Sequence, residues 1–169
     1  KILESENCPL GGKRRAELFT RHWGRAVLEG DEGEPLIVHS VHTFAGWADV
    51  RHWEVKQILD VVRRDLATGH SVIVQGDLNH TPNGPEYDLW LDAGLVDTFS
   101  QMHGDTDDGK TLLRPQPRAR LDYVLAGGAI VNQLVEARPL YEDDFRLYED
   151  RPDFVALSDH LPQFARFDW

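Results

Sequence analysis

Cysteine is almost absent from this chain, and its scarcity limits what can stabilise the fold. Cys8 is the single cysteine among 169 residues, which excludes an internal disulfide and a zinc centre built from cysteines. No apolar run approaches the ~20 residues of a membrane-spanning helix. Residues Lys1 to Asn7 lack the apolar core of a signal peptide. We therefore expect a soluble protein, and these absences favour a cytoplasmic location.

Basic residues are also in deficit. The chain holds 18 Lys and Arg against 29 Asp and Glu, which gives a formal net charge of −11 at pH 7. Such an excess repels a polyanion unless basic residues gather on one face. Duplex nucleic acid is therefore not the first substrate that we expect. Part of the excess belongs to a candidate metal site, where a bound dication would neutralise it.

What is present fits one globular α/β domain. Hydrophobic residues make up 41% of the chain, and neither repeats nor a linker divide it, so we expect a single domain over residues 1–169. Apolar periodicity predicts a helix over 49–68 and a shorter one over 86–92. Strands are expected over 36–43, 71–76, 121–126, 130–140 and 164–169. Residues 1–34 are interpreted as a loop, a strand near 26–28 and a turn, and residues 101–109 as a surface loop.

The most informative stretch is the strand that ends in Gly76-Asp77-Leu78-Asn79. A β-branched run, 72–74, is typical of a strand buried on both faces, and Gly76 lets the backbone turn where the strand ends. Asp77 and Asn79 stand two residues apart, so in extended geometry both side chains leave the same side of the backbone. They can hold a hard cation or a phosphate. Alone, the tetrapeptide equally suits an ordinary turn closed by its own side chains.

Three further stretches change that balance. Val38-His39-Ser40-Val41-His42-Thr43 lies upstream, and Arg120-Leu121-Asp122-Tyr123 and Ser158-Asp159-His160-Leu161-Pro162 lie downstream. With the central motif, these ordered stretches resemble the endonuclease/exonuclease/phosphatase superfamily of metal-dependent phosphohydrolases. The resemblance runs from about Val38 to Phe167 and more loosely back to Gly24. It implies an α/β fold in which a two-sheet β-sandwich is flanked by helices.

The resemblance also implies roles for individual residues. Asp77 would orient and activate the attacking water, and Asn79 would contact the phosphate or the metal. Asp159 would be a metal ligand, so that Asp77, Asn79 and Asp159 form the expected metal site. The implied ion is Mg²⁺, with Mn²⁺ possible, because carboxylate and amide oxygens suit hard cations.

Two histidines complete the implied catalytic set. His160 would bind the phosphoryl oxygens or pair with a carboxylate, and Asp122 would orient it. His42 would donate to a phosphate oxygen or assist the leaving group. His39 and His42 form a His-x-x-His pattern, but on a strand they face opposite sides, which argues against a shared zinc ion.

A segment ahead of Asp122 carries three arginines, Arg114, Arg118 and Arg120, interleaved with two prolines. Guanidinium groups match phosphate oxygens two at a time, so the segment can clamp a second phosphate or an anionic headgroup. A solvated basic loop explains the pattern equally well. Trp47 and Trp53 are the aromatic residues nearest the end of the His42 strand, and either can stack on a base or sugar; for Trp53, we expect burial under the helix instead.

The family's N-terminal strands have no counterpart in this sequence. Members of the superfamily begin with a strand that carries an asparagine and a strand that ends in Gln-Glu, whose glutamate binds metal, and neither precedes His42. Ile2-Leu3-Glu4-Ser5 resembles the strand that follows. We therefore expect an N-terminally incomplete domain, with the missing part outside this sequence, supplied by another chain, or replaced by a dimer contact.

The resulting hypothesis is a Mg²⁺-dependent phosphohydrolase that cleaves a phosphomonoester or phosphodiester of a small or lipid-like substrate. The alternative within the enzyme class is an endonuclease or exonuclease acting on DNA or RNA, whose arginines form a local basic face. The alternative from another class is a catalytically inert fragment that serves as a binding module.

Overall fold

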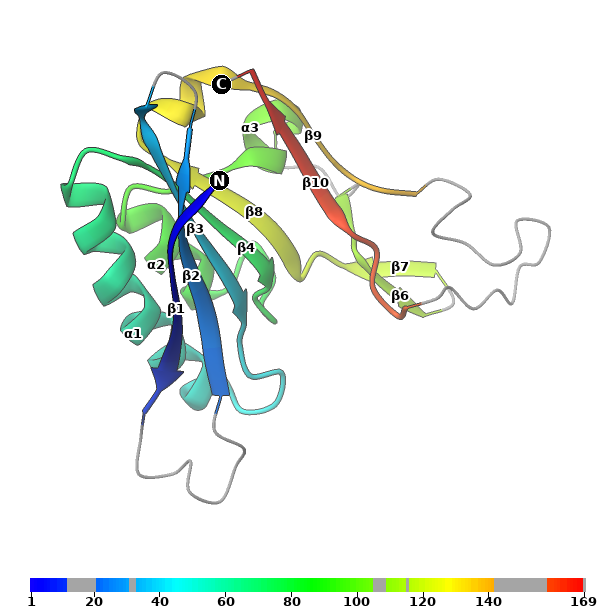
Figure 1. Ribbon diagram of the computed structural model, residues 1–169. Coiled ribbons are helices and arrows are strands. Elements are labelled where there is room, and N and C mark those ends of the chain that lie inside the picture. The colour runs from blue at the N-terminus through cyan, green and yellow to red at the C-terminus, as the bar shows by residue number, and fades with distance from the viewer. Residues whose placement is uncertain (12–20, 31–32, 105–108, 115, 142–157, 169) are drawn as a thin grey trace.

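The computed structural model describes residues 1–11, 21–30, 33–104, 109–114, 116–141 and 158–168. A six-stranded sheet with the order β1-β2-β3-β4-β8-β5 forms the centre of this part of the chain, and β9 and β10 form a second, two-stranded sheet (Figure 1). The elements are β1 (Ile2–Leu10), β2 (Arg21–Glu29), β3 (Pro35–His42), α1 (Ala48–Ala67), β4 (Ser71–Asp77), α2 (Pro85–Asp92), β5 (Val96–Asp97), α3 (Thr98–His103), β6 (Leu112–Arg114), β7 (Gln116–Ala119), β8 (Asp122–Gly127), the 3₁₀ helix η4 (Ala129–Gln133), β9 (Leu134–Pro139) and β10 (Gln163–Phe167).

The β3-α1-β4 unit is the part of the fold that positions the site. β3 and β4 are parallel, and every other pairing in the main sheet is antiparallel. A parallel pair needs a crossover, and α1 supplies it, as the helical periodicity predicts. Val55, Ile58, Leu59 and Val62 are fully buried along one stripe of α1. The helix ends just before Gly69, whose φ of 84° is the left-handed conformation common after a helix.

Each face of the main sheet has its own apolar cluster. Val72 and Val74 of β4 are fully buried against α1 and α2, whereas Ile73 between them faces the opposite side. There Ile73 packs with Val124 of β8, and Phe167 of β10 covers this second cluster. The alternation confirms the expectation of a strand buried on both faces, and it makes the fold a sandwich of a large and a small sheet with helices outside (Figure 1).

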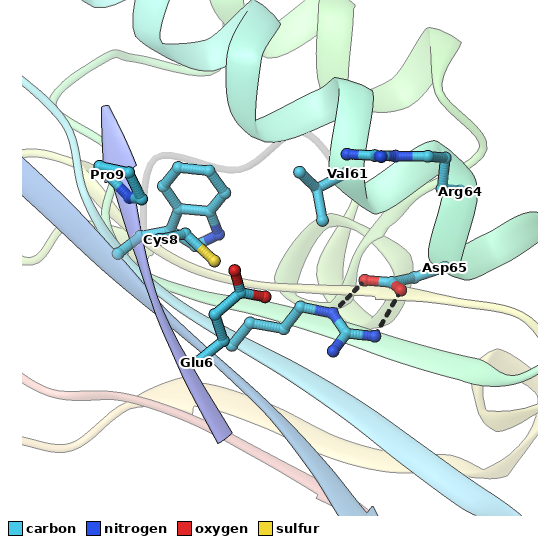
Figure 2. Close-up of a pocket in the computed structure, with 8 residues that line it drawn as sticks. Glu6, Cys8, Pro9, Val61, Arg64 and Asp65 are labelled. Carbon is cyan, nitrogen blue, oxygen red and sulfur yellow. Dashed lines mark hydrogen bonds and ion pairs between the residues drawn. The ribbon is translucent and has the colours of Figure 1, made fainter. Parts of the chain in front are cut away.

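An ion-pair network lies on the α1 face, where a cavity of about 400 Å³ opens between β1, β2 and α1 (Figure 2). The Arg25 guanidinium donates to both carboxylate oxygens of Asp65, at 2.9 and 2.7 Å. His39 Nε2 lies 2.9 Å from the same carboxylate, and Trp23 Nε1 donates to His39 Nδ1 at 3.3 Å. Burial lowers the pKa of His39, so this imidazole is a neutral structural link between β3 and α1.

Gly76 is required by the close approach of two strands. Its φ is 132°, and a Cβ at this position would lie 2.0 Å from the carbonyl oxygen of Val41 on β3. Only glycine fits there. The sequence interpretation assigned Gly76 to a turn, but the structure places it inside the β3-β4 pairing, one residue before the strand ends.

Several local expectations are wrong. Residues 2–10 form the strand β1, so the loop expected there from composition is wrong, whereas the resemblance of residues 2–5 to a family strand agrees with the structure. The composition is misleading because β1 is a mostly exposed edge strand without apolar alternation. Residues 101–103 belong to α3, which Asp97 caps by accepting hydrogen bonds from the amides of Phe99 and Ser100. The strand expected over 130–140 is η4 followed by the shorter β9, and the arginine segment is the β6-β7 hairpin. No helix in the described residues is long and apolar enough to span a membrane.

Candidate active site

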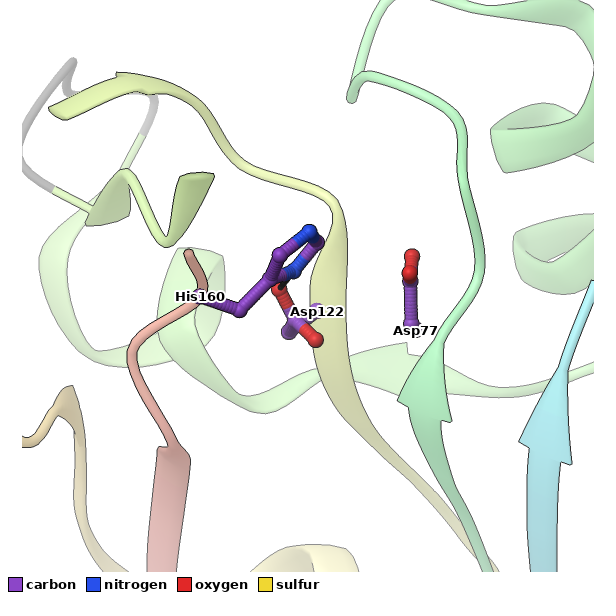
Figure 3. Close-up of side chains that lie close together, drawn as sticks. All are labelled: Asp77, Asp122 and His160. Atoms are coloured by element: carbon purple, nitrogen blue, oxygen red, sulfur yellow. Dashed lines mark hydrogen bonds and ion pairs between the residues drawn. The ribbon is translucent and has the colours of Figure 1, made fainter. Parts of the chain in front are cut away.

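Three ionisable side chains from distant parts of the chain meet at one edge of the main sheet. Asp77 ends β4, Asp122 begins β8, and His160 lies in the segment that leads into β10. Each offers one ligand atom, and these atoms all lie within 4.8 Å of one another (Figure 3). The cross-strand pairing of Asp77 with Asp122 explains part of this arrangement, because directly opposed residues of antiparallel strands share a face.

His160 is held through both its ring and its backbone. Its Nδ1 donates to Asp122 Oδ2 at 2.7 Å, and its backbone forms an isolated bridge with Leu112 of β6. The next amide, that of Leu161, donates to the Thr111 carbonyl at 2.8 Å. With Nδ1 committed to Asp122, Nε2 is the ring nitrogen left for chemistry.

Thr111 fixes Asp122 in turn, and nothing in the sequence pattern singled it out. Its hydroxyl donates to Asp122 Oδ2 at 2.5 Å and accepts from the amides of Leu121 and Asp122 at 3.2 Å each. The Thr111 side chain is fully buried. It is therefore a positioning residue for the Asp122–His160 pair.

The charges of the cluster shift its pKa values. Burial raises the pKa of Asp77, and the neighbouring Asp122 carboxylate raises it further. Burial alone would lower the pKa of His160, but the hydrogen bond and charge of Asp122, with the charges of Asp77 and Asp159, outweigh burial and raise it. The cluster therefore favours an imidazolium at His160 and resists two unneutralised carboxylates.

Asn79 forms the turn that the motif also permitted. Its φ is 51°, its amide donates to Asp77 Oδ1 at 2.9 Å, and its side-chain Nδ2 donates to the Thr43 carbonyl at 2.9 Å. Asn and Asp tolerate this left-handed conformation better than most residues. The turn and the cluster are thus compatible, because the same Asp77 carboxylate closes the turn and faces Asp122.

His42 and Asp159 lie beside the cluster. His42 Nε2 is 3.6 Å from Asp77 Oδ2, and the His42 side chain is 64% exposed at the end of β3. Its neighbour His39 is fully buried on the other face, so the two histidines do point to opposite sides. Asp159 is exposed. Within the described residues, it does not belong to the cluster of Asp77, Asp122 and His160.

One of the three predicted arginines, Arg120, is committed inside the fold. Arg120 is 7% exposed, and its guanidinium contacts Asp97 at 2.6 Å and Ser100 Oγ at 3.0 Å inside the fold. Arg118 is exposed, and the side chain of Arg114 lies outside the described residues. An arginine that sequence reasoning missed is nearer: Arg21 of β2 donates from Nη2 to the His42 carbonyl, and the charge of Asp77 acts on it.

The donor set fits a divalent cation. Two carboxylates face each other across β4 and β8, and the pKa of Asp77 is raised first by burial and then by the charge of Asp122, so a dication between them would stabilise the ionised form. Carboxylate oxygens suit hard cations, and one imidazole nitrogen is compatible with several divalent metals.

The sequence model of the Endonuclease/Exonuclease/phosphatase family matches residues 7–160. The chain belongs to this family. Its members are hydrolases of phosphate esters and are generally metal-dependent, in keeping with the acidic and histidine cluster.

Among curated proteins, the chain is 28% identical over 116 residues to the inositol phosphosphingolipids phospholipase C of Saccharomyces cerevisiae. This match covers 59% of the chain and spans about a quarter, 24%, of that protein. The chain therefore corresponds to part of a longer relative.

Solved structures of the family share the fold at low identity. A mannosyl-6-phosphatase of Bacteroides thetaiotaomicron superposes with a TM-score of 0.77 at 16% identity, covering 100% of this chain and 67% of that one. A 3′ phosphatase from Neisseria, solved with a product DNA hairpin, gives 0.72 at 20% identity, covering 100% and 72%.

Proposed function

We propose that the chain is part of a Mg²⁺-dependent phosphohydrolase that cleaves a phosphate ester of a small or lipid-like substrate by attack of water. The observation that carries the proposal is the meeting of Asp77, Asp122 and His160 within 4.8 Å at one sheet edge, with His42 beside Asp77. Phosphoester hydrolysis needs a group that orients water, donors for the developing phosphoryl charge, and a cation.

The residues of the cluster divide this work. Asp77 accepts a proton from the attacking water and orients it, and its raised pKa suits a base that works nearer neutral pH than a free aspartate does. His160, protonated more readily than a free histidine, donates from Nε2 to a phosphoryl oxygen. Asp122 positions His160 through Nδ1, and the exposed His42 donates to the leaving group.

The cation would be held by carboxylates of this cluster. Asp77 and Asp122 offer oxygens there, and Asn79 and Asp159 remain the further oxygen ligands expected from the sequence. When bound, Mg²⁺ would supply neutralising charge for the phosphoryl oxygens.

Two of the relatives support a polyol phosphate as the substrate. The yeast relative is named for inositol phosphosphingolipids and the Bacteroides phosphatase for mannosyl-6-phosphate, so both names describe a phosphate esterified to a six-membered polyol ring. A phospholipase C releases the lipid alcohol and leaves that ring on the phosphate, whereas a sugar phosphatase releases the ring itself. The net charge of −11 also favours a small or lipid-borne phosphate over a polyanion. The Neisseria phosphatase with its DNA hairpin keeps a nucleic-acid substrate as the second candidate.

A substrate panel tests the proposal. The chain is assayed with Mg²⁺ on a sugar phosphate, an inositol-phosphate lipid, a 3′-phosphorylated oligonucleotide and plasmid DNA. We expect hydrolysis of the first two, and its loss in His160→Ala and in Asp77→Asn, with circular dichroism confirming that both variants fold. Met102→Ala, an exposed change on α3, is the control. Preferred, salt-sensitive cleavage of DNA would favour the nuclease, and a folded but silent chain would favour an inert binding module.

A further inference from the structure

The loop between β3 and α1 exposes a pair of aromatic rings. Trp47 is 58% exposed, and its ring centroid lies 5.8 Å from that of Phe44 at an interplanar angle of 45°. Trp47 occupies the N-cap position of α1, and its side chain makes no capping hydrogen bond. Ser, Thr, Asp or Asn at this position normally stabilises a helix, so the exposed indole contributes neither to capping nor to the core.

Phe44 is fixed from several sides. Its amide donates to Oε2 of the buried Glu54 at 2.6 Å, and its carbonyl accepts from Arg51 Nη1 at 3.3 Å. Its ring folds back over Gly46, where a Cβ would lie only 2.7 Å from Phe44 Cε1. The Arg21 guanidinium also lies over this ring, 5.9 Å from its centroid. The support beneath Trp47 is therefore ordered before any ligand binds.

The same loop is bonded directly to the candidate active site. The Thr43 amide donates to the Asp77 carbonyl at 3.0 Å, and the Thr43 hydroxyl donates to the Leu78 carbonyl at 2.5 Å. Asn79 Nδ2 donates to the Thr43 carbonyl at 2.9 Å. Phe44 follows at once in the chain, so the aromatic pair is held next to the strand end that carries Asp77.

We propose that Trp47, supported by Phe44, positions the substrate by stacking on the six-membered polyol ring of its alcohol half, a sugar or a cyclitol. This inference rests on the proposed function and names what the site recognises beyond the phosphate. The C–H face of such a ring is apolar and packs on an indole, while its hydroxyls can reach polar groups at the rim, where His42 and Arg21 lie.

A membrane surface is a poorer occupant for this aromatic pair. Ala45, Gly46 and Ala48 around Trp47 are small, and the exposed Asp49 adjoins them. Membrane-binding segments combine a broad apolar face with Lys and Arg, whereas this chain carries a net charge of −11. A small, rigid pair of aromatic rings beside a phosphate site instead suits stacking on a single ring of a bound substrate.

Selectivity between ring and open-chain substrates tests the inference. The values of kcat/KM for mannose 6-phosphate and glycerol 3-phosphate are compared in the wild-type chain and in Trp47→Ala, Trp47→Phe and Met102→Ala. Trp47→Ala should lower the ratio of ring to open-chain kcat/KM about two- to tenfold, mainly through KM for the ring substrate. Trp47→Phe should restore most of the ratio, and Met102→Ala should leave it at the wild-type value.

Binding without turnover separates this inference from the proposed function. In an Asp77→Asn background, calorimetric titration with the same two phosphates should show a ring preference that Trp47→Ala removes. If the wild-type chain hydrolyses nothing, the proposed function fails, and the titration still decides the role of Trp47. An unchanged ratio in both assays overturns the stacking, and so does a loss confined to a lipid phosphoester in vesicles, which would assign the pair to a membrane surface.

Discussion

Protonation of His80 should destabilise the fold over a defined pH range. His80 is 3% exposed, one residue after Asn79. Trp90 Nε1 donates to His80 Nε2 at 3.0 Å, and His80 Nδ1 donates to the Thr81 carbonyl at 3.3 Å, so the ring is held neutral with its proton on Nδ1. Burial lowers the pKa of His80 from 6.5 to about 4.

Whether stability rises or falls with pH depends on which state, folded or unfolded, binds the His80 proton more tightly. The unfolded chain protonates His80 near its ordinary pKa of 6.5, whereas the folded chain resists protonation until about pH 4. Stability from this group is therefore complete above the unfolded pKa and is lost as the pH falls through the folded pKa. Between pH 7 and pH 5 the two values correspond to a loss of about 2 kcal/mol in the free energy of unfolding.

Urea unfolding of the wild type and of His80→Gln at pH 7 and pH 5 measures the effect. Glutamine offers Trp90 an oxygen acceptor but does not titrate. Other groups titrate in both proteins, so the informative quantity is how much the stability difference between them changes with pH. We expect a change of about 2 kcal/mol in favour of His80→Gln at pH 5. A change below about 0.5 kcal/mol would refute the burial argument.

Three further predictions concern the site and its scaffold. Thr111→Val removes the hydroxyl that holds Asp122 and should lower kcat and cost about 1–3 kcal/mol of stability; unchanged turnover in a steady-state assay would contradict its positioning role. Gly76→Ala should cost about 3 kcal/mol or more in urea unfolding, because its Cβ meets the Val41 carbonyl, whereas Gly69→Ala, with open space and only its positive φ, should cost about 1 kcal/mol. Equal losses of stability in the two variants would show that contact with the Val41 carbonyl is not what requires glycine at position 76. Chelation of divalent cations should abolish hydrolysis, with recovery on adding Mg²⁺; activity retained in chelator would refute the metal requirement.

The sequence predicts the β3-α1-β4 unit well because its signals are local. The apolar stripe of α1 repeats at helical spacing, and Gly69 ends it. Local patterns do not predict β1, because an exposed edge strand needs no apolar alternation and its nine residues resemble a polar loop. Only the family resemblance of residues 2–5 indicates a strand there. α3 escapes because Asp97 caps a helix of only six residues.

Part of the candidate site is also predictable from local sequence signals. Motifs identify Asp77, Asp122 and His160, and the structure brings all three together. The supporting contacts are tertiary contacts that no local pattern encodes: Thr111 resembles any buried threonine, and Arg21 lies far from His42 in sequence. Arg120 shows the opposite error: the sequence suggests a substrate-binding arginine, but its guanidinium forms an ion pair with the buried Asp97.

The opposition of Asp77 and Asp122 makes the candidate site depend on strand register. Side chains alternate between the two faces of a sheet, so a slip of one residue between β4 and β8 would carry Asp122 to the α1 face and replace it with an apolar neighbour. The carboxylates would then be separated without any change in composition or in secondary structure content. A shifted β8 would therefore abolish the proposed cation binding in a variant that keeps Asp77, Asp122 and His160 and has a native circular dichroism spectrum.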